Sequence, residues 1–188
     1  MKTTLVILAA GLLACTASAQ VKVIGNGPAK ACYEATERGQ PGFALAIDLC
    51  NKALTGTTLK RSDQVATLVN RAILYMRAED LDKSEADLDR ARKLAPDLAD
   101  LDLNVGALRL YQGRNGEAIS LLTAAIEAGA NDLPAAYYNR GVAYEREDEL
   151  DRAYRDYTTA LALKPGWQVA IDQIDRFEVV EVDADTVE

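Results

Sequence analysis

The chain contains no histidine among its 188 residues. This absence removes the usual general base, the commonest metal ligand and every nucleophile that depends on a neighbouring imidazole. An enzyme built on carboxylates would not need histidine. However, the acidic residues occur mostly in runs such as Glu147-Asp148-Glu149, and such runs are typical of a solvated helix surface. We therefore expect no enzyme activity and no bound cofactor.

Glycine-rich phosphate loops are also missing, and so is any loop with the spacing of a calcium site. The paired carboxylates Asp82 and Glu85, or Asp148 and Asp151, could meet a cation, but without such a loop we expect no metal site. Positive charge is scarce, with 21 Lys and Arg against 29 Asp and Glu and a net charge of −8. This balance argues against a nucleic-acid partner and against binding to an anionic membrane by charge, and its simplest effect is solubility.

Only one long apolar run is present, and it lies at the start of the chain. Lys2 precedes the run from Leu5 to Leu13, and Ala17-Ser18-Ala19 follows it. This pattern is typical of a secretory signal peptide cleaved after Ala19, and the run is too short to span a membrane. We therefore predict a signal peptide over residues 1–19 that takes no part in the fold, an irregular segment over 20–28, and a periplasmic or secreted protein.

A second interpretation of the same segment stays open. Leu12-Leu13-Ala14-Cys15 loosely resembles a bacterial lipoprotein box, which would leave a lipid on Cys15 and place the protein at the outer membrane. The Ala-x-Ala site favours simple secretion over this alternative.

Cysteine is also rare, since only Cys32 and Cys50 remain once Cys15 leaves with the signal peptide. An even pair in an exported protein usually forms a disulfide. Residues 39–42 (Gly-Gln-Pro-Gly) indicate a tight turn, and position 41 is the midpoint between the two cysteines, so a helical hairpin there would bring them level. A redox-active pair is the alternative, but the Cys-x-x-Cys spacing is absent.

What the chain does have is a characteristic spacing of small residues. Counted from Pro134, Gly141 and Ala153 occupy positions 8 and 20, where two antiparallel helices could cross closely, and Pro165 would end the second helix. Tyrosine or alanine fills positions 4, 11, 24 and 27, at Tyr137, Tyr144, Tyr157 and Ala160. These offsets resemble the tetratricopeptide repeat, a helix–turn–helix unit of about 34 residues. A single unit cannot bury its own apolar face, so further copies are expected.

Further copies of the pattern follow one another along the chain. Residues 65–98 and 99–133 keep small residues at positions 8 and 20, and 29–64 looks like a degenerate first repeat. After the fourth repeat (134–167), residues 168–178 are expected to form a capping helix, and the acidic residues 179–188 a frayed tail. The resemblance implies an all-α fold, a right-handed α-solenoid of antiparallel helix pairs over residues 29–178.

The resemblance also implies a binding groove. Asparagine recurs at position 6 of three repeats, at Asn70, Asn104 and Asn139, and in this family an asparagine there often grips the backbone of an extended peptide. The amide carries both a donor and an acceptor, so it can pair with a peptide bidentately. The alternative, left open here, is that each asparagine only bonds within its own repeat.

The groove neighbours follow from the same repeat positions. They are Val69, Leu103 and Tyr138 at position 5, Ile73, Ala107 and Val142 at position 9, and Arg77 and Arg146 at the edge. Chaperone-binding members of the family carry lysine at position 5, so that specificity is not expected here. The apolar members could instead pack between repeats.

The sequence thus predicts a non-catalytic scaffold that binds a protein or peptide segment in the cell envelope. The alternative is a structural or assembly protein that acts through self-association or its convex surface.

Overall fold

The computed structural model describes residues 3–8, 17, 21–22, 27–38, 42–56 and 59–182. Over these residues the chain forms nine helices and two short strands. The helices are α1 (Pro28–Arg38), α2 (Phe43–Gly56), α3 (Arg61–Arg77), α4 (Leu81–Leu94), α5 (Ala99–Tyr111), α6 (Asn115–Glu127), α7 (Leu133–Arg146), α8 (Leu150–Leu163) and α9 (Gln168–Ile174). The strands are β1 (Thr3–Leu8) and β2 (Phe177–Val182).

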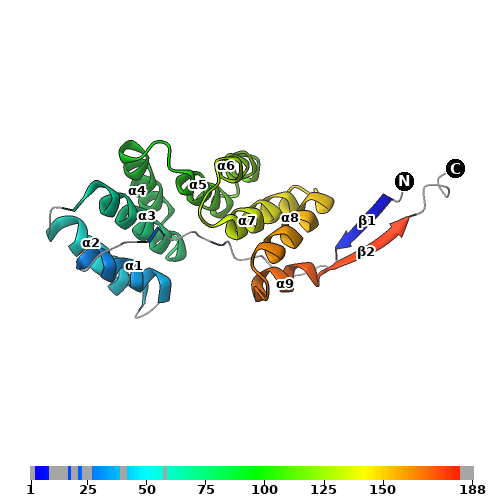
Figure 1. Ribbon diagram of the computed structural model, residues 1–188, viewed down its shortest axis with the longest axis horizontal. Helices are drawn as coiled ribbons and strands as arrows, with labels where there is room; N and C mark the ends of the chain where they lie inside the picture. The colour runs from blue at the N-terminus through cyan, green and yellow to red at the C-terminus, as the bar shows by residue number, and fades with distance from the viewer. Residues whose placement is uncertain are drawn as a thin grey trace.

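The helices stack in the order in which they occur along the chain (Figure 1). Each odd-numbered helix from α1 to α7 pairs with the helix that follows it, and α9 packs on α8. Between pairs, helices contact those of the next repeat, as α3 does with α1, α2 and α5. This serial stacking is the all-α solenoid that the sequence predicts.

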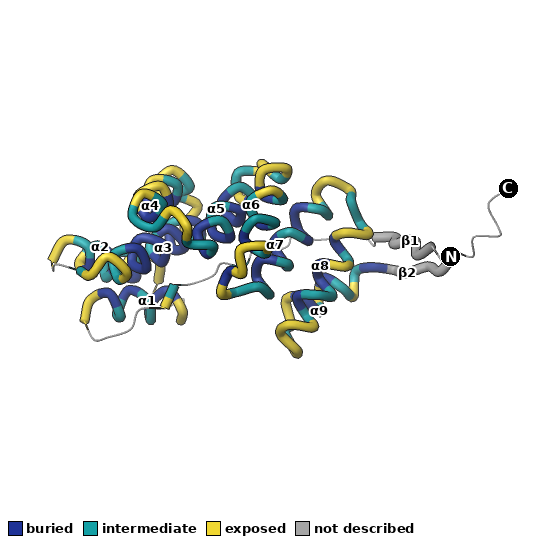
Figure 2. Tube along the Cα trace, turned by 45° about the horizontal axis from the view of Figure 1, so that its top comes forward, coloured by how far each residue is buried: buried dark blue, intermediate teal, exposed yellow. Residues whose placement is uncertain are grey.

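The first helix of the second, third and fourth repeats lies inside the stack, and the second helix of each covers it. In Figure 2 the buried positions concentrate on α3, α5 and α7, whereas α2, α4 and α6 carry long exposed stretches. Leu68, Leu108 and Tyr138, one from each inner helix, are fully buried. Burial of these apolar side chains is the main driving force for stacking one repeat on the next.

The two helices of a repeat approach each other most closely at a small residue. A β-carbon added at Gly141 of α7 would lie 2.9 Å from the Tyr157 ring and 3.2 Å from the Ala153 carbonyl oxygen of α8. One added at Gly106 of α5 would lie 2.7 Å from Leu122. All three distances are shorter than ordinary contacts between heavy atoms, so these two crossings require glycine.

The turn inside the second, third and fourth repeats has one backbone conformation, whatever residue occupies it. Glu79, Gly113 and Asp148 occupy the same repeat position, and all have positive φ, between 60° and 72°. The next amide then bonds back to the preceding helix, as Asp80 N does to the Tyr75 carbonyl at 2.9 Å. This left-handed residue ends the first helix and reverses the chain.

The first repeat is shortened and joined by a disulfide. Cys32 of α1 and Cys50 of α2 are fully buried, and their Cα atoms lie 4.6 Å apart across a sequence separation of 18. These are the two cysteines that the sequence predicts to pair. Residues 39–41 of the predicted turn lie outside the described residues.

Some predicted boundaries differ from those of the structure. Helix α3 begins at Arg61, four residues before the predicted start of the second repeat. The capping helix ends at Ile174 and not at residue 178, and β2 follows, paired antiparallel with β1 from Thr3↔Val182 to Leu8↔Phe177. The β-branched valines of the Phe-Glu-Val-Val-Glu-Val sequence favour a strand over a helix. Residues 183–188 lie outside the described part.

The expectation that residues 1–19 take no part in the fold is also not met. Strand β1 falls within them, and the β1–β2 pair projects from the α9 end of the solenoid (Figure 1). Cys15 and Ala19, the alternative processing sites, lie outside the described residues. None of the helices in the described ranges has the length and apolar character needed to cross a membrane.

Replacement of Gly141 by alanine should destabilise the fourth repeat. The added methyl group meets the Tyr157 ring and a backbone oxygen that cannot yield, so we expect a loss of about 1–3 kcal/mol in the free energy of unfolding. Gly116→Ala is the matched control, because no atom lies within 4 Å of the added carbon, and it should be neutral or slightly stabilising. Urea unfolding followed by circular dichroism measures both, and equal effects would contradict the crossing argument.

Removal of the disulfide should destabilise the N-terminal end. With a loop of 18 residues, Cys32→Ser/Cys50→Ser should cost about 3 kcal/mol of folding free energy. Thermal melts with and without reductant measure this, since reductant should lower the Tm of the wild type and leave the variant unchanged. Thiol titration of the denatured, unreduced protein should leave Cys32 and Cys50 unreactive, and free thiols at both would overturn the pairing.

Candidate functional site

The three asparagines predicted for the groove lie on successive inner helices. Asn70 is on α3, Asn104 on α5 and Asn139 on α7, and all three side chains are fully buried. We call the face formed by these three residues the inner face. A buried amide has to be hydrogen-bonded to avoid a large desolvation cost, so the partners of these side chains show what the face can bind.

Asn139 pairs with the backbone of a residue 122 positions away. The amide of Ala17 donates to Asn139 Oδ1 at 2.7 Å, and Asn139 Nδ2 donates in return to the Ala17 carbonyl oxygen. One asparagine side chain thus satisfies both backbone groups of a single residue. It does so without contacting any polar side chain of that residue, because alanine has none.

Asn70 makes the same pair of bonds two repeats earlier. The Val21 amide donates to Asn70 Oδ1 at 3.1 Å, and Asn70 Nδ2 donates to the Val21 carbonyl oxygen at 2.9 Å. Ala17 and Val21 are four residues apart, and an extended chain presents the backbone groups of every second residue to one side. The four-residue interval between the two pairings matches that period, and residues 18–20 lie outside the described residues.

Asn104, between them, forms one hydrogen bond within its own helix. Its Nδ2 donates to the carbonyl oxygen of Asp100 at 2.8 Å, one turn back on the same helix. Asp100 itself is buried and accepts from the backbone amide of Asn131 at 2.9 Å. The Nδ2 group of Asn104 thus bonds within its own repeat, which is the alternative that the sequence analysis left open.

The apolar residues predicted for the groove belong to the core, and the segment packs against that core. All six are buried, namely Val69, Ile73, Leu103, Ala107, Tyr138 and Val142. Val69 and Ile73 belong to a cluster on which Val21 packs, and Tyr138 and Val142 to one on which Ala17 packs. These side chains therefore join neighbouring repeats and also support the extended segment.

The two arginines predicted for the groove edge bind the preceding repeat. Arg77 Nη1 donates to the Thr36 carbonyl oxygen of α1 at 2.8 Å, and Arg146 Nη1 to that of Leu110 on α5 at 2.7 Å. Carbonyl groups in the last turn of a helix lack intrahelical donors. Both arginines thus cap the first helix of the preceding repeat, and burial lowers the pKa of the Arg77 guanidinium.

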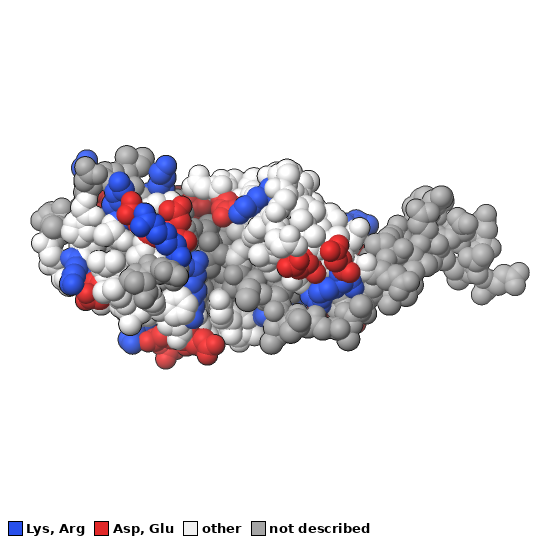
Figure 3. Space-filling model, turned by 90° about the horizontal axis from the view of Figure 1, so that it is seen from below, with Lys and Arg blue, Asp and Glu red and all other residues white. Residues whose placement is uncertain are grey.

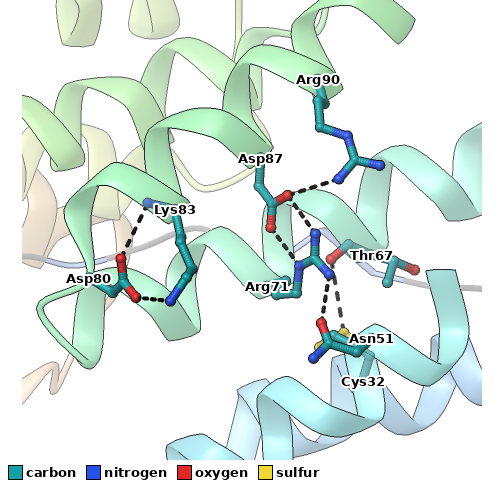
Figure 4. A network of polar contacts seen from close by, with 9 residues as sticks. Cys32, Asn51, Thr67, Arg71, Asp80, Lys83, Asp87 and Arg90 are labelled. Atoms are coloured by element: carbon teal, nitrogen blue, oxygen red, sulfur yellow. Dashed lines mark hydrogen bonds and ion pairs between the residues drawn. A yellow bond between two sulfur atoms is a disulfide. The ribbon is translucent and has the colours of Figure 1, made fainter. Parts of the chain in front are cut away.

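The ion pair between Arg71 and Asp87, which recurs in another repeat, was not predicted from the sequence. Arg71 forms two bonds of 2.6 Å with Asp87 and one of 2.6 Å with Asn51 of the preceding repeat, and Arg90 lies 3.3 Å from the same carboxylate (Figure 4). Burial by itself would lower the pKa of Arg71, but the hydrogen bonds to Asp87 outweigh it and raise that pKa.

The fourth repeat has the same pair, and the third lacks both partners. Arg140 binds Asp156 at 2.7 and 3.0 Å and Thr123 of the preceding repeat at 3.1 Å. The corresponding positions of the third repeat are Val105 and Leu121. The recurrence of arginine and aspartate 16 positions apart, kept or lost together, is the signal that would have revealed these pairs.

The fourth repeat also carries an aromatic cluster at the Asn139 end of the inner face. The Tyr138 ring centroid lies 5.5 Å from that of Tyr157 and 5.2 Å from that of Trp167. Tyr157 donates its hydroxyl to Glu145 at 2.8 Å, and Arg176 pairs with the other oxygen of that carboxylate. Burial raises the pKa of the Tyr157 hydroxyl, so it remains a hydrogen-bond donor at any physiological pH.

Among the described residues no three metal-ligating side chains come together. Figure 3 shows acidic and basic side chains side by side in small groups on one face, with no broad basic field. The arrangement supplies backbone hydrogen bonds and apolar contact, which are properties of a binding surface.

Comparison with known proteins agrees with this geometry. The family model described as "Tetratricopeptide repeat" matches residues 134–166. No curated protein matches the chain in sequence.

Several solved structures share the fold. A crystal structure of MamA is 23% identical, with a TM-score of 0.57, over 80% of this chain and 82% of that one. The second TPR domain of human RPAP3, solved in complex with an HSP70 peptide, is 22% identical, with a TM-score of 0.53, over 62% of this chain and 96% of that one. YrrB, titled a TPR protein with an unusual peptide-binding site, is 21% identical, with a TM-score of 0.55, over 77% and 73%.

Breaking one buried ion pair should cost more than removing it whole. Arg140→Val leaves the Asp156 carboxylate, 6% exposed, without its partner, and should lower the free energy of unfolding by about 3–5 kcal/mol. Arg140→Val/Asp156→Leu copies the third repeat and should recover most of that loss. Arg114→Ala, which breaks an exposed pair with Glu117, is the control and should cost less than about 1 kcal/mol. A double variant no more stable than the single variant in urea would contradict the argument.

Proposed function

Because this chain belongs to the tetratricopeptide repeat family, we propose that its inner face binds an extended segment of a partner protein and catalyses no reaction. The observation that carries the proposal is the bidentate pairing of Asn70 and Asn139 with the backbone groups of Val21 and Ala17. Both asparagines offer a donor and an acceptor to one residue each, which is how an amide recognises a peptide backbone.

Recognition of this kind depends on the conformation of the bound segment more than on its sequence. The contacts go to the amide and carbonyl groups that every residue except proline carries. Each hydrogen bond contributes about 1 kcal/mol net, so two asparagines give a modest, reversible affinity that apolar contacts with the inner helices supplement. At position 5, where chaperone-binding members of the family carry the lysine that holds a C-terminal carboxylate, this chain has Val69, Leu103 and Tyr138. An internal segment of the partner therefore suits this face better than a chain end.

Two further considerations support a peptide ligand. The RPAP3 domain, which has the same fold, was solved with an HSP70 peptide. In addition, charged residues of the inner helices, such as Arg71 and Arg140, already form hydrogen-bonded ion pairs within their own repeats. The ligand is therefore recognised through backbone and apolar groups, not through charge.

We place this activity outside the cytoplasm. The support is the pattern of a signal peptide cleaved after Ala19, together with the Cys32–Cys50 pairing, since disulfides persist in oxidising compartments. A lipid on Cys15 is the alternative, with the protein at the outer membrane. The intact mass of the chain recovered from a bacterial host distinguishes the two, because cleavage after Ala19 and lipidation at Cys15 give different products.

Substitution of the asparagines should weaken peptide binding without unfolding the protein. We expect Asn70→Ala and Asn139→Ala each to lower the affinity for peptides selected from a library of unstructured decapeptides by about thirtyfold, since each removes two hydrogen bonds of about 1 kcal/mol. Asn115→Ala is the control, because Asn115 binds Glu147 away from the inner face, and it should leave the affinity unchanged. Fluorescence anisotropy measures binding, and circular dichroism at 222 nm confirms retained helicity.

Two outcomes would reject the proposal. One is peptide affinity that is the same in the wild type and in Asn70→Ala/Asn139→Ala with full helicity. The other is concentration-dependent self-association in light scattering that the asparagine variants leave unaltered, combined with no peptide binding. The second outcome favours an assembly protein that acts through its outer surface.

A further inference from the structure

The backbone groups that pair with Asn70 and Asn139 belong to the protein itself. Ala17 lies on Asn139 and Val21 on Asn70, and Val21 precedes the first residue of α1 by only seven positions. We propose that the segment that contains Ala17 and Val21 is an intramolecular competitor in the unprocessed chain, where it holds Asn139 and Asn70 until cleavage after Ala19 or a partner segment displaces it. This inference rests on the proposed function, because it concerns the same asparagines.

The segment uses the same contacts that a partner would need. It takes both hydrogen-bonding groups of Asn70 and of Asn139. It also packs against the clusters that contain Ile73 and Tyr138. A second extended chain cannot make these bonds while the first is in place, because each asparagine has already paired its acceptor oxygen and a donor hydrogen with the segment.

The segment runs against the order of the repeats. Its earlier residue, Ala17, pairs in the fourth repeat, and its later residue, Val21, pairs in the second. The two pairing residues are four positions apart in the sequence, and their asparagines are two repeats apart. Each repeat therefore corresponds to two residues, which is the period at which an extended chain presents its backbone groups to one side. A displacing segment in the same register should run in the same direction and present a small residue at Asn139, where Ala17 packs beside the aromatic cluster.

The two ends of the segment are not held equally. Val21 packs on two hydrophobic clusters and lines a pocket of about 350 Å³ with Val65, Leu94, Ala95 and Leu98. Ala17 offers only a methyl group to its cluster. Val21 is therefore the anchor and Ala17 the more readily displaced end. The cleavage after Ala19 that the sequence predicts would remove Ala17 and retain Val21, which would open the Asn139 end of the face.

A tethered competitor is effective even when each of its contacts is weak. Between Val21 and Pro28 the chain can span at most about 25 Å, and short linkers give effective concentrations in the millimolar range. If the free peptide binds with a Kd of about 100 μM, the tethered copy lowers the apparent affinity for a competitor by about tenfold.

The test weakens the binding of the segment to the inner face in the full chain. It then measures how tightly the inner face binds a separate peptide that has the sequence of the segment. Ala17→Pro/Val21→Pro removes the two amide donors to Asn139 and Asn70, and neither position lies in a helix. Lys22→Pro is the matched control, because Lys22 is exposed and its amide makes no hydrogen bond within the described residues. The probe is a fluorescein-labelled peptide of residues 16–22 (TASAQVK), and the readout is anisotropy.

We expect Ala17→Pro/Val21→Pro to bind the probe about tenfold more tightly than the wild type, and Lys22→Pro to bind it like the wild type. Addition of Asn70→Ala/Asn139→Ala to the double-proline variant should abolish the gain. Equal affinity in the wild type and the double-proline variant would overturn the competition while leaving the proposed function intact. So would a released variant that binds library peptides but not the probe. If neither the probe nor the library peptides bind any variant of retained helicity, both proposals fail.

Discussion

The contact on which the rest of the structure depends is the close crossing of two helices at a small residue. At Gly141 the backbone of α7 meets the Tyr157 ring and the Ala153 carbonyl of α8 with no room for a β-carbon. This proximity fixes the angle within each helix pair, and the repeated angle stacks the pairs into a solenoid with one continuous inner face. The asparagines align on that face because they share one repeat position on consecutive inner helices.

Polar groups buried inside such a stack each need a partner. The arginines meet this need within and between repeats, where Arg71 and Arg140 join an aspartate of their own repeat to a polar side chain of the preceding one. In the third repeat both charges are replaced together by apolar residues, which avoids leaving one buried charge unpaired. Asn70 and Asn139 differ from these, because their partners come from a chain segment outside the repeats.

The sequence predicted the repeats well because their information is local. The spacing of Gly141, Ala153 and Pro165 reports helix crossing and helix ending directly, and the asparagines follow from their place in the repeat. The row of asparagines on three inner helices could therefore be predicted from the repeat spacing, whereas its suitability for an extended backbone came from the resemblance to the tetratricopeptide repeat.

What the sequence did not reveal depends on contacts between distant residues. The pairing of Arg71 with Asp87 and the capping roles of Arg77 and Arg146 join separate helices, and no single window of sequence contains both partners. The same holds for β1 and β2, which lie 169 residues apart at their closest ends, and for Ala17 with Asn139. The occupant of the inner face could not be predicted because a signal-peptide pattern gives no reason to place those residues in the fold.

An asparagine row also limits how strongly the inner face can hold any one chain. Its hydrogen bonds go to groups that nearly every residue carries, so they distinguish extended chains from folded ones but hardly one extended sequence from another. Selection among partners must then come from the apolar contacts beside the row and from which segment is nearest. A segment tethered to α1 has the advantage of proximity, whereas a partner has to gain its advantage from a longer or better-fitting apolar contact. The balance between proximity and fit, more than any single strong bond, would thus decide which chain occupies the inner face.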